Sequence, residues 1–182
     1  MNTKRKVILY IAMSLDGYIA KSDDDISFLS IVEQKGQDYG YAEFVKNVDT
    51  VIWGRRTYDQ ILSFGIPFPH PDKKVFVITR TAKPKKANVT FYSDSLKNLI
   101  ENLKAQNGKN IYVDGGADIV NELMKQNLID ELIISIIPVL LGCGKPLFQQ
   151  GRPENSLSLL SSIQYDKGLM QLHYVCIENM VS

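Results

Sequence analysis

The sequence has few of the residues that build metal centres and disulfide frameworks. Its 182 residues include two cysteines and two histidines, which lie scattered along the chain. Two cysteines are too few for a disulfide framework, and no ligand cluster has the spacing of a metal site. We therefore expect no metal and a reducing, cytoplasmic location.

The sequence also lacks an excess of charge and a long apolar run. Its net charge of +1 disfavours nucleic acid and anionic membranes as partners. No apolar run is long enough to span a bilayer. The basic N-terminus superficially resembles a signal peptide, but the apolar run is short and Ser14-Leu-Asp-Gly17 follows without a cleavage pattern. We therefore predict a first strand over Val7–Met13.

What remains is the composition of a soluble globular protein. Hydrophobic residues make up 45% of the chain and charged residues 23%. This length suits one domain, so we expect a single domain over residues 1–182.

Strands alternate with helices along most of the chain. Further strands are predicted over 50–54, 74–79, 89–92, 110–113 and 131–138, and helices over 41–48, from 55, over 96–103 and from 119. Segments 157–163 and 169–177 can pair as a terminal hairpin around Asp166-Lys-Gly168. This order predicts an α/β fold in which helices flank a mostly parallel sheet with an antiparallel C-terminal hairpin.

The stretch from Asn110 to Asp118 combines a strand, the pair Gly115-Gly116 and a helix start. A helix N-terminus offers unpaired N–H groups, and glycine lets an anion approach the backbone. The stretch alone fits either a phosphate site or a tight turn, because short glycine motifs are weak signals.

Two other strand ends carry comparable residues. Gly54-Arg55-Arg56-Thr57 follows one strand and Thr79-Arg80-Thr81 follows the next. The carboxyl ends of parallel strands share one edge, where ligands bind. Two glycine-to-helix turns suit a pyrophosphate, and arginines suit an additional phosphate, so the pattern favours NADPH over NADH. It is not a Rossmann fingerprint, because no G-x-G-x-x-G follows the first strand.

Three other features have plain interpretations. Asp23-Asp24-Asp25 is interpreted as a solvated loop rather than a metal site. His70, between prolines, is expected to be a surface residue rather than a catalyst. The basic run from Lys83 to Lys86 could extend the positive patch, but a solvated loop is the simpler interpretation.

Four motifs occur in the order of a known family: Ser14–Ala20, Gly54–Tyr58, Val113–Ala117 and Asp130–Phe148. With them the chain resembles the dihydrofolate-reductase-like superfamily. Within it, the chain is similar to the reductase domain of bifunctional riboflavin-biosynthesis proteins, the RibD C-terminal domain. The resemblance implies a dihydrofolate-reductase-like fold and NADPH as the hydride donor.

The resemblance also implies roles for individual residues. Arg55 would lie near the adenosine 2′-phosphate, with Arg56 at a position that varies in the family. The residues that would surround the cofactor are Ala12, Leu15, Gly17, Ile19, Gly54, Arg55, Arg56, Thr57, Thr79, Arg80, Thr81, Gly115, Gly116, Ala117, Asp118, Ile119 and Val120. Asp16 is a candidate proton donor, with a turn former as the competing interpretation.

The substrate side is less defined. Dihydrofolate reductases place a carboxylate on the helix after the first loop, a position that falls here near Gly40, where Asp38 or Glu43 could substitute. Lys73 and Lys74 are the cations of the loop over 64–74, without an assigned role.

These observations predict an NADPH-dependent reductase of a small heterocyclic substrate. The resemblance favours 5-amino-6-(5-phosphoribosylamino)uracil, with dihydrofolate reduction as the alternative. A non-catalytic NADPH-binding protein is the competing class. Apolar terminal strands also suit a homodimer.

Overall fold

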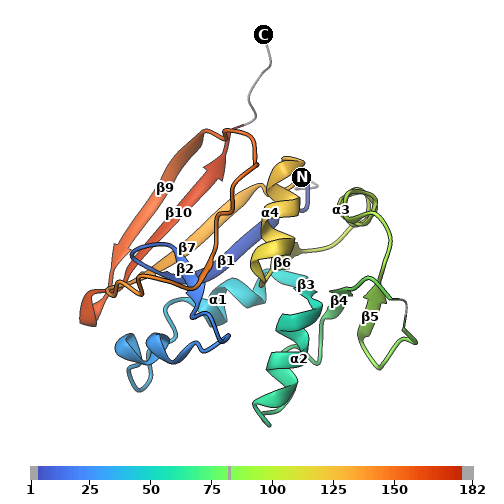
Figure 1. Cartoon of the computed structure of the whole chain (residues 1–182). Coiled ribbons are helices and arrows are strands. Elements are labelled where there is room, and N and C mark those ends of the chain that lie inside the picture. The colour runs from blue at the N-terminus through green and yellow to red at the C-terminus, as the bar shows by residue number, and fades with distance from the viewer. Residues whose placement is uncertain (1–3, 82, 178–182) are drawn as a thin grey trace.

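The computed structural model describes residues 4–81 and 83–177. Eight strands form one sheet in the order β5-β4-β3-β6-β1-β7-β10-β9 (Figure 1). The strands of this sheet are β1 Val7–Ser14, β3 Val48–Gly54, β4 Lys74–Ile78, β5 Val89–Tyr92, β6 Asn110–Val113, β7 Glu131–Ile137, β9 Leu157–Gln164 and β10 Met170–Cys176.

The strand directions confirm the predicted sheet. Strands β5, β4, β3, β6, β1 and β7 pair in parallel with their neighbours. Strand β10 is antiparallel to β7, and β9 is antiparallel to β10, so the C-terminal hairpin forms the far edge. The fold is α/β with an antiparallel C-terminal addition.

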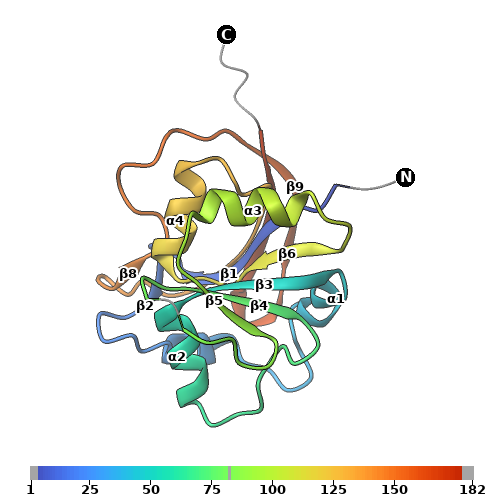
Figure 2. The same ribbon diagram turned by 90° about the vertical axis from the view of Figure 1, so that its right-hand side faces the viewer.

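Helices cover both faces of the sheet, as Figure 2 shows. The helices are α1 Tyr41–Lys46, α2 Arg55–Ser63, α3 Leu96–Lys104 and α4 Ala117–Lys125, with 3-10 helices η1 Ser27–Val32 and η2 Asp166–Gly168. Buried side chains of α3 and α4 pack with β1 and β6 in one core cluster. Side chains of α1 and α2 pack on the other face, against β3 and β4. None of the described helices is long and apolar enough to cross a membrane.

Helix α3 shows why the spacing of apolar residues predicts a helix. Leu96, Leu99, Ile100 and Leu103 recur at helical spacing and are all buried. Burying each such side chain contributes about 1.5–3 kcal/mol. The Oγ of Ser95 accepts a hydrogen bond from the backbone N–H of Asn98 at 3.3 Å, which caps the helix start.

Some predicted boundaries were wrong. The helix that begins at Tyr41 ends at Lys46, because Val48 is already part of buried strand β3. Thr79 and Pro138 lie just outside β4 and β7. Helix η1 was not predicted, nor was the small antiparallel sheet formed by β2 Tyr18–Ala20 and β8 Lys145–Pro146. Segments this short carry almost no periodicity.

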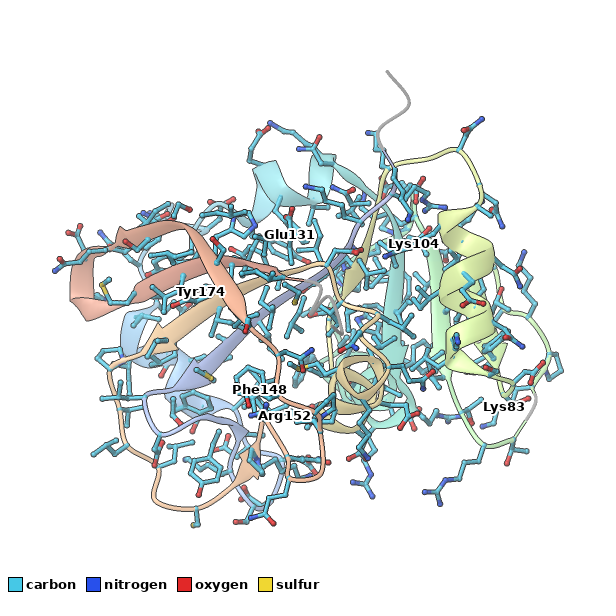
Figure 3. All side chains as sticks on the ribbon, turned by 90° about the horizontal axis from the view of Figure 1, so that it is seen from above. Lys83, Lys104, Glu131, Phe148, Arg152 and Tyr174 are labelled. Atoms are coloured by element: carbon cyan, nitrogen blue, oxygen red, sulfur yellow. The ribbon has the colours of Figure 1, made fainter. Side chains whose placement is uncertain are left out.

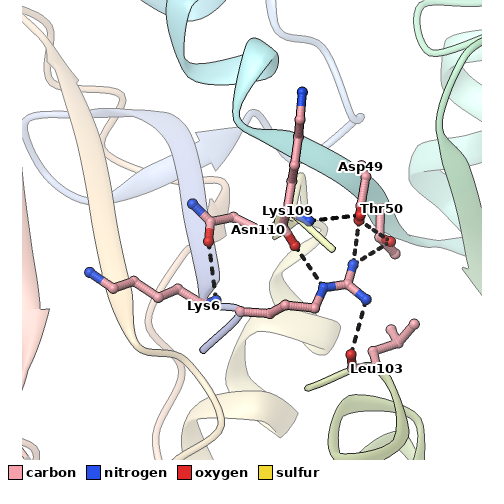
Figure 4. A network of polar contacts seen from close by, with 7 residues as sticks. Lys6, Asp49, Thr50, Leu103, Lys109 and Asn110 are labelled. Carbon is pink, nitrogen blue, oxygen red and sulfur yellow. Dashed lines mark hydrogen bonds and ion pairs between the residues drawn. The ribbon is translucent and has the colours of Figure 1, made fainter. Parts of the chain in front are cut away.

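At the edge of the sheet where the parallel strands begin, Arg5 links three segments, whose residues Asp49, Thr50, Leu103 and Lys109 are labelled in Figure 4. Its side chain is 3% exposed. Its Nε donates to the Lys109 carbonyl at 2.6 Å and its Nη1 to the Leu103 carbonyl at 3.0 Å. Its Nη2 donates to the Thr50 hydroxyl at 2.9 Å and pairs with Asp49. A buried guanidinium satisfied in this way ties β1 to β3 and to the α3–β6 loop.

Candidate functional site at the carboxyl edge of the sheet

The glycine motifs of β3 and β6 meet at the carboxyl edge of the sheet. The backbone N–H of Gly54 donates to the Gly115 carbonyl at 2.9 Å. A Cβ added to Gly54 would lie 3.2 Å from Ile119 Cγ1, and one added to Gly116 would lie 3.3 Å from Thr57 Oγ1. Gly115 has a φ of +104°, which favours glycine, and the Gly115–Gly116 peptide bond is cis. Two segments far apart in the sequence therefore form one junction without side chains.

Two helices begin at this junction. Helix α2 starts after Gly54 and α4 after Gly116, and neither start is capped by a side chain of the described residues. By contrast, Ser95 caps α3. Uncapped N–H groups and the helix dipole at both starts make the junction suitable for an anion. The arrangement fits a pyrophosphate, which has two negatively charged groups close together.

Arg55, at the start of α2, is already held in place. Its Nε donates to Asp59 Oδ2 at 2.6 Å, and its Cζ lies 5.7 Å from the ring centroid of Phe91 on β5. The Nζ of Lys83 lies 6.0 Å from the same ring; Figure 3 labels this lysine. Two cations lie near one ring, and the Nη groups of Arg55 are bound to none of the described residues, so the surface beside the junction is positive. Arg56 is exposed next to it.

The turn after β4 lies next to the turn after β3. The backbone N–H of Thr79 donates to the Tyr92 carbonyl at 2.9 Å, and that of Thr81 donates to Thr79 Oγ1 at 3.3 Å. Arg80 is exposed. The three residues thus form a structured turn on the same edge as Gly54, because β3 and β4 are parallel neighbours.

The first loop covers the carboxyl end of β1. The Leu15 N–H donates to the Val139 carbonyl at 2.9 Å, and the Gly17 carbonyl accepts from the Leu147 N–H at 2.9 Å. The Leu15 side chain is 61% exposed, whereas Ile19 packs against the core. The loop therefore presents an apolar side chain to solvent beside the site.

Asp16 joins this loop to the one after β7. Its carboxylate accepts hydrogen bonds from Ser14 Oγ at 2.5 Å, the Gly142 N–H at 2.7 Å and the Leu141 N–H at 3.1 Å. The hydrogen bond from Ser14, followed by those from the backbone, lowers the pKa of Asp16. An ionised carboxylate with three donors is suited to holding two loops together, which favours the turn-former interpretation.

The residues in the first turn of α4 differ in their exposure. Val120 is completely buried in the core, so its side chain does not reach the edge. Asp118 is exposed and its Oδ1 accepts from Gln149 Nε2 at 3.1 Å. The Ala117 carbonyl accepts from the buried Asn121 amide at 2.7 Å. Ile119 packs beside Gly54. The backbone of this turn, rather than these side chains, faces the junction.

A carboxyl that the sequence analysis did not single out lies at the end of β6. Asp114 accepts hydrogen bonds from Trp53 Nε1 at 2.7 Å and from the Tyr112 hydroxyl. Burial raises its pKa from 3.8 to about 6, although its hydrogen bonds act in the opposite direction. Asp114 can therefore hold a proton closer to neutral pH than an ordinary aspartate. Its position directly before Gly115 was the only available signal.

His70 is buried, and the expectation of a surface residue was wrong. The ring is 1% exposed and packs against Trp53 and Tyr112. Its Nε2 lies 3.4 Å from the Tyr41 hydroxyl, and its Nδ1 has no hydrogen-bond partner among the described residues. Burial lowers the pKa of His70 to about 4, so the ring is neutral at pH 7. Tertiary packing of the proline-rich loop, which its composition did not indicate, buries it.

A cavity of about 330 Å³ opens beside the carboxyl half of β1. Its sheet side includes Tyr10 and Ala12 of β1 and Ser135 of β7, and its other wall comes from the segment over 29–39. Ala12 belongs to the residues expected near the nicotinamide, so the cavity adjoins the predicted cofactor position. Glu33 and Asp38 line it. Glu43, the other candidate carboxylate, instead pairs with Lys46 at 2.7 Å on the surface.

Lys73 and Lys74 lie away from this edge. Lys74 is the first residue of β4, so both lysines sit at the amino end of a strand whose carboxyl end faces the site. Lys73 pairs with Asp72 at 3.1 Å.

Beyond β8 the guanidinium of Arg152 lies 5.3 Å from the ring centroid of Phe148 (Figure 3).

Comparison with known proteins places this geometry in a family. The sequence profile of the RibD C-terminal domain matches residues 66–171. YwjB, an uncharacterized protein of Bacillus subtilis strain 168, is 43% identical over 94% of this chain and 98% of its own length. A crystal structure of a protein from Shewanella sp. PV-4, provisionally named a riboflavin biosynthesis protein, superimposes with a TM-score of 0.87. The two sequences are 32% identical, and the match covers 94% of this chain and 99% of that one.

Two less similar structures share the fold. A diaminohydroxyphosphoribosylaminopyrimidine deaminase/5-amino-6-(5-phosphoribosylamino)uracil reductase from Thermotoga maritima has a TM-score of 0.71 and 15% identity, covering 96% of this chain and 57% of that one. Dihydrofolate reductase from Enterococcus faecalis, complexed with NADP(H), has a TM-score of 0.67 and 15% identity, covering 95% and 97%. The fold is therefore dihydrofolate-reductase-like, and the chain belongs to the RibD C-terminal domain family of reductase domains.

Proposed function

We propose that the chain is an NADPH-dependent reductase of a small heterocyclic substrate, folded as one domain over residues 1–182. The observation that carries the proposal is the glycine junction, where two uncapped helix starts meet at the carboxyl edge. The dihydrofolate reductase from Enterococcus faecalis is complexed with NADP(H), which supports the choice of cofactor. Family membership supports a substrate of the riboflavin pathway type.

Three turns of this chain would each bind a different part of the cofactor. The N–H groups at the starts of α2 and α4 would bind the pyrophosphate, with Gly54, Gly115 and Gly116 allowing its close approach and Thr57 beside them. Arg55 would contact the 2′-phosphate through its two Nη groups, because Asp59 already holds its Nε. Residues 79–81 would line the adenosine. Ala12 and the loop over 15–19 would orient the nicotinamide beside the cavity.

When bound, the nicotinamide supplies the hydride, and the protein contributes binding and orientation. Ala12 forms part of the cavity wall, so a ring in the cavity would lie against the same strand that borders the nicotinamide. Apolar side chains such as Leu29 and Val32 line the cavity and would exclude water from the reacting face.

The cofactor assignment is tested by Arg55→Ala. Without the guanidinium, the 2′-phosphate loses a charge-assisted hydrogen-bond donor. We therefore expect NADPH to bind at least about tenfold more weakly and NADH to change little, as measured by calorimetry. Lys125→Ala, which removes an exposed cation from the far end of α4, is the control and should leave both affinities unchanged. Equal losses for NADPH and NADH would reject the 2′-phosphate contact.

We further propose that two copies of the chain pair through the C-terminal hairpin. Strand β9 is exposed along its whole length and carries large apolar side chains. Leu157, Leu159, Leu160 and Ile163 are 40–53% exposed on this edge strand. Such an edge is an aggregation hazard unless a partner covers it. A symmetric pairing of two identical edges would bury it.

A further inference from the structure

We infer that the substrate of the proposed reductase is an unphosphorylated heterocycle that carries N–H donors or a positive charge. This inference rests on the proposed function, because it concerns the cavity next to the predicted nicotinamide position. The inference is based on a small cavity that is lined by two carboxylates and, among the described residues, by no basic side chain.

The size of the cavity limits what can enter. Its volume of about 330 Å³ is at the lower end of the range of roughly 300–1,000 Å³ for ligand pockets. Its apolar lining comes from Ala12, Leu29, Val32, Ile137 and Leu169. A flat ring system fits such a space better than a ring extended by a sugar phosphate.

The polar groups on the sheet side are already occupied. The Tyr10 hydroxyl donates to the Tyr39 carbonyl at 2.9 Å and accepts from Gln171 Nε2 at 3.0 Å. The same amide also donates to Ser135 Oγ at 3.1 Å. Gln171 is 8% exposed and holds Tyr10 and Ser135, which both line the cavity. Recognition of a polar substrate therefore falls to the groups on the other wall.

That other wall is negative. Asp38 accepts hydrogen bonds from the Ala42 N–H at 2.9 Å and the Gly40 N–H at 3.0 Å, so its carboxylate is fixed at the start of α1. These backbone hydrogen bonds lower the pKa of Asp38, which keeps it ionised at neutral pH. Glu33 lies on the same wall. Carboxylates accept hydrogen bonds and attract cations, and they repel a phosphate monoester of charge about −1.5 to −2.

The nearby cations do not reverse this charge pattern. Lys167 donates to the Glu33 carbonyl from η2, outside the lining, and Lys35 is exposed on the same segment. Lys46 is paired with Glu43. Arg55, on α2, belongs to the glycine junction. The positive groups thus gather where the cofactor's phosphates are proposed, and the substrate cavity is left acidic.

The test compares two probes that differ only in the phosphate: 5-amino-6-ribosylaminouracil and its 5′-phosphate. Calorimetry would measure the affinity of each for the full chain, with and without saturating NADPH. We expect the dephosphorylated probe to bind about tenfold more tightly, because the two carboxylates on the wall repel the phosphate. Tighter or equal binding of the phosphate, or no binding of either probe at millimolar concentration, would overturn the inference.

A double variant, Glu33→Gln with Asp38→Asn, should remove the preference for the dephosphorylated probe, because it neutralises the wall and keeps the shape. The amide oxygen of the second substitution would retain an acceptor for the start of α1, and a thermal melt would check the fold. Glu43→Gln removes an exposed carboxylate outside the cavity and should keep the preference. If the preference persists in the double variant, the carboxylates are not its cause. Failure of NADPH to bind would reject the proposed function separately, because probe binding is also measured without it.

Discussion

Replacing Asp114 with asparagine should make the protein's stability less sensitive to pH. Asp114 combines burial with two fixed donors, Trp53 Nε1 and the Tyr112 hydroxyl, and burial raises its pKa to about 6. Asparagine is almost the same size and keeps an acceptor oxygen, but it cannot ionise. The difference between wild type and Asp114→Asn therefore isolates the titration of this one carboxyl.

The sign of the effect follows from proton binding. Between pH 3.8 and about 6 the unfolded carboxyl is ionised while the native carboxyl keeps its proton. The native state then binds more protons, so the free energy of unfolding falls as the pH rises through this window. A shift from 3.8 to about 6 corresponds to roughly 3 kcal/mol at 1.36 kcal/mol per unit. Partial exposure of Asp114 reduces this to about 2–3 kcal/mol.

Urea unfolding at a series of pH values from below 4 to above 7 would measure the effect. We expect wild type to lose about 2–3 kcal/mol relative to Asp114→Asn across that range, and the difference to be constant above pH 7. Asp166→Asn, at an exposed carboxylate on η2, is the matched control and should change stability by less than about 0.5 kcal/mol. A difference between wild type and Asp114→Asn that does not vary with pH, or that grows in favour of wild type as the pH rises, would refute the reasoning.

Two further predictions concern the fold and the assembly. Arg5→Met should lower the free energy of unfolding by roughly 3–5 kcal/mol in urea, because it breaks a buried ion pair and leaves the Leu103 and Lys109 carbonyls without this donor. Arg152→Met, which removes an exposed arginine and its contact with the Phe148 ring, should cost no more than about 1 kcal/mol, and a similar cost for both would contradict the role of Arg5. Sedimentation should show a dimer of the 20.6 kDa chain. The double variant Leu159→Asp with Ile163→Asp should be a monomer with an unchanged circular dichroism spectrum. A monomeric wild type would exclude the proposed pairing.

Much of the fold was predictable because its signals are local. The short apolar run Val7–Met13 favours a buried strand, which the structure extends to Ser14. The spacing of Leu96, Leu99, Ile100 and Leu103 favours a helix that buries one face. The short elements escaped prediction, since β8 has two residues and its pairing with β2 depends on distant parts of the chain. His70 was placed on the surface because burial by Trp53 and Tyr112 leaves no mark in its own neighbourhood of the sequence.

The amino-acid sequence by itself determined where strands end in glycine and basic residues, and so which turns could hold phosphates. That follows from local chemistry: glycine permits close approach, and a helix start offers N–H groups. Only the tertiary structure decided that Gly54 and Gly115 are hydrogen-bonded neighbours, that Val120 faces the core, and that Asp114 is partly buried between Trp53 and Tyr112. It also decided the charge of the cavity beside β1. Glu33 and Asp38 line it because the segment over 29–39 folds back over β1 and β7, a long-range contact that no local pattern encodes.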